Sequence, residues 1–121
     1  MYRKMFGLFG GNKFERMAKK GNVNALGQYS SNPKADIRMQ VVKALGNVVD
    51  NTDAGNALVV YLRDPDRQVQ LEAVKSMGKI GVSAHATHLN TLRTQAQKEG
   101  DSELEKAANE ALQVLRERLG K

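Results

Sequence analysis

Apolar side chains recur along the chain at spacings of three and four residues, which is the period of one face of an α-helix. The clearest stripe lies in residues 34–49, and a second stripe of the same spacing lies in residues 65–80. No stretch alternates apolar and polar residues in the manner of a β-strand. The pattern therefore predicts an all-α protein. The two stripes are Ile37, Val41, Ala44, Leu45 and Val48, and Val69, Ala73, Val74, Met77 and Ile80.

Capping residues set the expected limits of the helices. Asn32 with Pro33, and Asp64 with Pro65, have the form of an N-cap followed by proline at the first helical position. Residues 102–105 have the sequence of a capping box, in which two side chains satisfy free backbone N–H groups. We expect helices at residues 13–20, 23–30, 33–49, 54–63, 65–80, 83–99 and 102–119.

The chain repeats itself with a period of 32 residues, so that Tyr29 recurs as Tyr61 and Gly46 recurs as Gly78. A third copy is offset by 35 residues, because extra residues stand in the turn at 98–101. A fixed period in this range is typical of stacked helix pairs. We expect three pairs, at about residues 22–50, 51–82 and 83–119. Together they form a repeat domain of residues 13–121, preceded by a flexible segment of residues 1–12.

Residues 36–48 and 64–81 resemble HEAT repeats, most closely the short prokaryotic type that also occurs in phycobilisome lyases. The resemblance covers about residues 22–119 and implies a right-handed α-solenoid of three helix pairs. In the family pattern an acidic residue in the turn and an arginine early in the second helix form a ladder between repeats. Arg38 matches that arginine, but Gln70 and Glu105 stand at the other two positions, so we expect a broken ladder. The resemblance implies a protein-binding scaffold without catalytic activity.

The second helix of each pair lines the concave side of a HEAT-type stack. A turn of 100° per residue places one set of side chains opposite the apolar stripe, at equivalent positions of successive repeats. We expect this set to form an exposed concave strip that binds a partner protein. The alternative is that these long side chains only cover the helix surface or pack on a neighbour. The strip consists of Met39, Lys43, Asn47, Leu71, Lys75, Lys79 and Lys106, and its equivalent positions continue to Glu110 and Val114.

The net charge of +6 is concentrated at the N-terminus. Residues 1–20 hold six basic side chains and one acidic side chain, whereas residues 21–121 hold 13 basic and 12 acidic side chains. A nearly neutral repeat region, no tryptophan and few aromatic residues argue against nucleic-acid binding. Nucleic acid remains the alternative partner, because three strip lysines continue the basic N-terminus.

The N-terminal segment mixes basic and aromatic side chains, notably Arg3, Lys4, Phe6 and Phe9. Such a segment is suited to an anionic membrane surface or to a partner protein. It could equally cover the open end of the first repeat. The sequence leaves these alternatives open.

The residue types present exclude several kinds of chemistry. The absence of cysteine excludes disulfides, thiolate zinc sites and cysteine nucleophiles. His85 and His88 are three residues apart, but no third ligand completes a metal site. No nucleophile elbow, P-loop or carboxylate pair is present, so we expect no enzyme activity and no cofactor. No apolar run is long enough to span a membrane and no signal peptide is recognisable, so we expect a cytoplasmic protein.

Overall fold

The computed structural model describes residues 12–120, and all regular secondary structure in this range is helical, which confirms the all-α prediction. Residues 1–11 lie outside the described range, and with them the candidate contacts Arg3, Lys4, Phe6 and Phe9. The α-helices are α2 (Lys13–Lys19), α3 (Val23–Gly27), α4 (Ala35–Leu45), α5 (Thr52–Leu58), α6 (Arg67–Ile80), α7 (Ala86–Glu99) and α8 (Ser102–Arg118). Three 3₁₀ helices, η1 (Gln28–Ser31), η2 (Val59–Arg63) and η3 (Ser83–His85), extend or precede the first helix of a pair.

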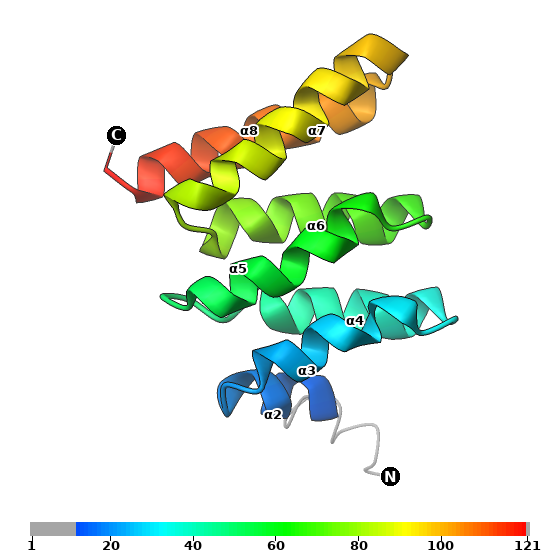
Figure 1. Cartoon of the computed structure of the whole chain (residues 1–121), viewed down its shortest axis with the longest axis vertical. Coiled ribbons are helices and arrows are strands. Elements are labelled where there is room, and N and C mark those ends of the chain that lie inside the picture. The colour runs from blue at the N-terminus through cyan, green and yellow to red at the C-terminus, as the bar shows by residue number, and fades with distance from the viewer. Residues whose placement is uncertain (1–11, 121) are drawn as a thin grey trace, which may run out of the picture.

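The helices stack in two layers, with α3, α5 and α7 in one layer and α4, α6 and α8 in the other (Figure 1). Within the layers, α3 packs against α5, α4 against α6 and α6 against α8. Helices α2 and α8 lie at opposite ends of the stack (Figure 1). The three expected helix pairs are therefore present as an α-solenoid.

One continuous hydrophobic core lies between the two layers. The second apolar stripe is buried throughout, whereas Ile37 and Val48 of the first stripe are only partly buried. Tyr61 is fully buried and donates a hydrogen bond from its hydroxyl to the carbonyl oxygen of Leu26, 2.8 Å away. Burial raises the pKa of Tyr61 above its ordinary value. This contact joins the first helix of one repeat to the next, as expected where each repeat buries its apolar face on its neighbours.

The predicted starts of α4 and α6 are wrong by two residues. The N-cap positions are Lys34 and Asp66, not Asn32 and Asp64. Asp66 accepts hydrogen bonds from two backbone N–H groups in the first turn of α6. Asn32 instead closes the preceding turn, where its side-chain oxygen accepts a hydrogen bond from the N–H of Lys34 at 2.9 Å. Each proline therefore lies in the turn and not at the first helical position.

Further helix limits also differ from the prediction. The helix expected to begin at residue 54 begins at Thr52, with Asn51 as its N-cap. The helix expected to reach residue 49 ends at Leu45. The N-cap of α8 is Asp101, whose side chain accepts a hydrogen bond from the N–H of Leu104 at 3.2 Å, so Ser102 is the first helical residue and the predicted capping box is absent. A carboxylate one residue earlier takes the capping role from the serine hydroxyl.

The repeated glycines lie where neighbouring helices approach each other closely. A Cβ atom at Gly78 would lie 2.8 Å from the carbonyl oxygen of Ala111, and one at Gly46 would lie 2.5 Å from the hydroxyl oxygen of Ser76. Neither position has room for a larger residue without a shift of its neighbour. Close packing of neighbouring helices therefore accounts for the recurrence of glycine at these two positions.

Helix α2 covers the N-terminal end of the stack. Phe14 and Ala18 are buried, and the Phe14 ring meets the edge of the Tyr29 ring with centroids 4.9 Å apart. Asn12 caps α2 and donates a hydrogen bond to the side-chain oxygen of Gln40. The basic side chains Lys13, Lys19 and Lys20 stay exposed. Within residues 12–120, no helix has both the length and the apolar character needed to cross a membrane.

Candidate functional site

The strip residues lie on the outward side of the layer formed by α4, α6 and α8. Four-residue spacing keeps successive side chains of one helix on the same face. Met39 and Leu71 are partly buried and pack against the core. They are therefore less exposed than we expected for the apolar members of the strip. The exposed members are Lys43, Asn47, Lys75, Lys79 and Lys106.

Adjacent repeats bring members of the strip together. The ammonium group of Lys79 on α6 lies 3.5 Å from the side-chain oxygen of Asn47, which follows α4. Among residues 12–120, Lys43, Lys75 and Lys106 form no ion pair. Their positive charges are therefore not neutralised within the described part of the chain.

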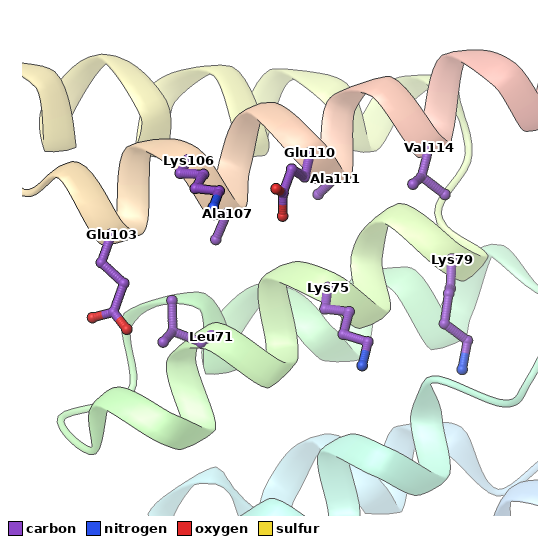
Figure 2. Close-up of a pocket in the computed structure, with 9 residues that line it drawn as sticks. All are labelled: Leu71, Lys75, Lys79, Glu103, Lys106, Ala107, Glu110, Ala111 and Val114. Carbon is purple, nitrogen blue, oxygen red and sulfur yellow. The ribbon is translucent and has the colours of Figure 1, made fainter.

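A groove of about 490 Å³ runs between α6 and α8 (Figure 2). Figure 2 shows Ala107, Ala111 and Val114 pointing from α8 towards α6. Lys75 and Lys79 come from α6 on the opposite side, and their ammonium groups point away from α8. Val114 is 40% exposed although it is apolar. Four members of the predicted strip and both of its continuing positions line this groove. The lining is Leu71, Lys75, Lys79, Glu103, Lys106, Ala107, Glu110, Ala111 and Val114.

The other strip residues lie outside this groove. Met39 lies in a second hollow, between α4 and the start of α6, beside Asp36 and Asp66. Asn47 lines a smaller hollow of about 210 Å³ between α2 and α4, with Glu15. Lys43 lines neither of these. The structure thus divides the strip among several hollows, of which the α6–α8 groove holds the most members.

Three residues that line the groove were not among the predicted strip positions: Glu103, Ala107 and Ala111. Glu103, Ala107, Glu110 and Val114 follow one another at spacings of four, three and four, which places them on one face of α8. This spacing could have been used to predict that these residues share one face. The depth of the groove could not be predicted from the sequence, because it depends on how α6 and α8 cross.

The expectation of a broken ladder is wrong at the first junction between repeats. Arg38 of α4 reaches the turn before α6 and pairs with Asp64 through Nε at 2.8 Å and a terminal nitrogen at 3.0 Å. A third hydrogen bond of 2.7 Å runs from Arg38 to the carbonyl oxygen of Asn32. Both side chains are nearly inaccessible, with 9% and 3% exposed. The hydrogen bond that Arg38 donates to Asp64 raises the pKa of the Arg38 guanidinium, so Arg38 carries its positive charge.

The second junction has a different pair. Gln70, which replaces the arginine, donates a hydrogen bond to the carbonyl oxygen of Leu62 at 2.9 Å. The ion pair is made instead by Arg67 and Asp101, 2.6 Å apart, with side chains 40% and 20% exposed. The hydrogen bond from Arg67 lowers the pKa of the Asp101 carboxyl group. Sequence reasoning missed Arg67, because it stands three residues before the family position.

His85 has a structural environment. It is buried, its Nδ1 accepts a hydrogen bond from the N–H of Val82 at 2.9 Å, and its Nε2 lies 2.8 Å from the side-chain oxygen of Asn56. This arrangement requires the neutral ring with its proton on Nε2. Burial lowers the pKa of His85, and nearby His88 lowers it further. No group of three or more side chains suited to a metal occurs in the part of the chain that the structure describes.

Comparison with known proteins identifies the repeat. The family model described as HEAT repeats matches residues 22–113, which is well over half of the chain. No curated protein and no solved structure matches the chain. The matched range contains the helix pairs from α3 to most of α8, and it includes every groove-lining residue except Val114.

Proposed function

The chain belongs to the HEAT-repeat family, whose members generally mediate protein–protein interactions, and on this premise we propose that it is a non-catalytic module that binds a partner protein. The binding surface is the face formed by α4, α6 and α8. The α6–α8 groove carries the proposal, because it combines exposed apolar surface at Val114 with lysines that have no acidic partner in residues 12–120.

This combination is suited to protein recognition. Apolar area that becomes buried on association supplies binding free energy, while charges at the rim favour a complementary partner and speed the encounter. The groove volume of about 490 Å³ is in the range of sites that hold several side chains. We also propose that the module acts in the cytoplasm. A chain without cysteine forms no disulfides, and proteins of that compartment rarely contain them.

Nucleic acid is a weaker candidate for this face. Glu103 and Glu110 stand beside the lysines and would repel phosphate groups. No aromatic side chain lines the groove, so bases would have no surface on which to stack. Membrane or partner contact through Arg3, Lys4, Phe6 and Phe9 stays a prediction about residues outside the described range.

The proposal is tested by affinity capture from a lysate of the source cells. Lys75→Glu with Lys79→Glu reverses two exposed charges in the groove, whereas Lys34→Glu with Lys98→Glu makes the same charge change elsewhere on the surface. One protein should be retained by the wild type and by the control variant and lost from the groove variant. Circular dichroism should show equal helicity in all three. Equal capture by all three would contradict the proposed face.

A further inference from the structure

The two sides of the α6–α8 groove differ in charge. The α6 side presents Lys75 and Lys79, both exposed and both positive. The α8 side alternates in sign, with Lys106 between Glu103 and Glu110. Between them lies the apolar surface to which Val114 contributes (Figure 2). An occupant must therefore offer apolar side chains to the floor and negative charge to the α6 side.

No acidic side chain within residues 12–120 neutralises the α6 side. Lys75 forms no ion pair there, and Lys79 makes only a 3.5 Å contact with the neutral side chain of Asn47. Glu103, the acidic residue at one end of the groove, lies 3.8 Å from Arg67. Lys75 and Lys79 are therefore available to acidic groups of another molecule.

The walls of the groove also restrict the backbone of the occupant. Both walls are α-helices, whose backbone groups bond within the helix, so the groove offers side chains and no strand edge for an extended peptide to pair with. An occupant that satisfies its own backbone hydrogen bonds, as a helix does, loses none of them on binding. At 1.5 Å per residue, the α8 side from Glu103 to Val114 is about 16 Å long, which matches about three turns of a helix.

We propose that the groove binds an acidic amphipathic helix of about three turns in a partner protein. This inference rests on the proposed function and adds the class of ligand. Apolar residues of the ligand at spacings of three and four contact the floor, and Asp or Glu one turn apart faces Lys75 and Lys79, which are themselves one turn apart. Glu110 disfavours a ligand that is acidic on both flanks.

The test uses the full chain and a displayed library of random 16-residue peptides. Peptides selected by the wild type should carry an excess of Asp and Glu over Lys and Arg, with apolar residues at spacings of three and four. Lys75→Glu with Lys79→Glu should weaken their binding by more than about tenfold, whereas Lys34→Glu with Lys98→Glu should change it by less than about twofold. Peptides in which Lys replaces the acidic residues should regain affinity for the groove variant. Val114→Asp, at a partly exposed position, should abolish binding without loss of helicity.

The outcomes separate this inference from the proposed function. Selected peptides that depend on Val114 but are basic, or lack helical spacing, would overturn the ligand class and leave the protein-binding face intact. No dependence on the groove in either the library or the lysate capture would overturn both. A 20-nucleotide single-stranded DNA that binds through Lys75 and Lys79 and ignores Val114→Asp would assign the groove to nucleic acid.

Two further occupants are tested with the same variants. A dimer in sedimentation that Val114→Asp dissociates would assign the groove to a second copy of the chain and overturn the inference. Peptide binding that appears only after deletion of residues 1–11 would assign it to the chain's own N-terminal segment, with the same consequence.

Discussion

The two junctions between neighbouring repeats place their charges differently. Between the first and second repeats, Arg38 and Asp64 form a buried ion pair with a third hydrogen bond to the turn. Between the second and third, Arg67 and Asp101 pair at the surface. The second junction also holds the open groove with unpaired lysines.

The difference shows that similar helix stacking is compatible with a buried ion pair at one junction and an exposed ion pair at the next. At the first junction the charged groups are enclosed and hydrogen-bonded, which fixes the turn against the preceding helix. At the second, the turn between α7 and α8 has only Gly100 and Asp101, and Gln70 bonds to the preceding 3₁₀ helix instead of crossing to the next repeat. Charges left at the surface remain available to a ligand, and the following predictions test this contrast.

The largest effect is expected at the buried ion pair. Arg38→Ala leaves the Asp64 carboxylate buried without its partner, which should lower the free energy of unfolding by about 3 kcal/mol. Arg67→Ala removes an exposed pair and should have only a small fraction of that effect. Urea unfolding followed by circular dichroism measures both. An equal decrease in the free energy of unfolding for the two variants would show that the two ion pairs do not differ in strength.

The second effect concerns the two glycine contacts. Gly78→Ala places a methyl group against the backbone of Ala111 and should cost about 2 kcal/mol. Gly46→Ala meets the side chain of Ser76, so its loss should be smaller and should be reversed by Ser76→Gly. Ala111→Gly should rescue Gly78→Ala only in part, because the carbonyl oxygen of residue 111 remains. Full rescue at both junctions would show that the two contacts are alike.

The smallest effect on stability is the pH dependence expected from His85, which lies in η3 and contacts Asn56 of α5. Since burial lowers the pKa of His85 below its ordinary value of 6.5, the unfolded chain takes up this proton first as the pH falls. The free energy of unfolding should be at its full value above pH 6.5 and should fall below that pH, by at most about 1.4 kcal/mol per pH unit. Chemical denaturation between pH 7.5 and 5 should show this slope in the wild type and in His88→Gln, but not in His85→Gln. A slope that persists without His85 would place the titrating group elsewhere.

The helices and their inward faces could be predicted from the sequence, because burial of one face imposes a regular spacing. Val69, Ala73 and Met77 are buried as that spacing requires. The start of α6 could not be predicted from the sequence, because Asp64 and Asp66 are equally suited to the N-cap position. Arg38, from the previous repeat, bonds to Asp64 and leaves Asp66 to cap the helix. Local sequence does not contain that contact.

The candidate site was predictable to a similar extent. Helical spacing placed Lys75, Lys79 and Lys106 on the outer face, where they are exposed. It did not reveal that Met39 lies in a separate hollow, nor that the side chains of α6 and α8 enclose a groove. Those features depend on the distance and angle between helices, which contacts such as that of Gly78 with Ala111 determine.

The most direct test of the proposed face is photo-crosslinking in the source cells. A benzophenone amino acid is placed at position 110, in the α6–α8 groove, or at position 91, which is exposed on α7 in the other helix layer. The account predicts a crosslink to one protein from position 110 and none from position 91. Crosslinks from position 91 alone, or the same products from both positions, would contradict the assignment of the binding surface to α4, α6 and α8.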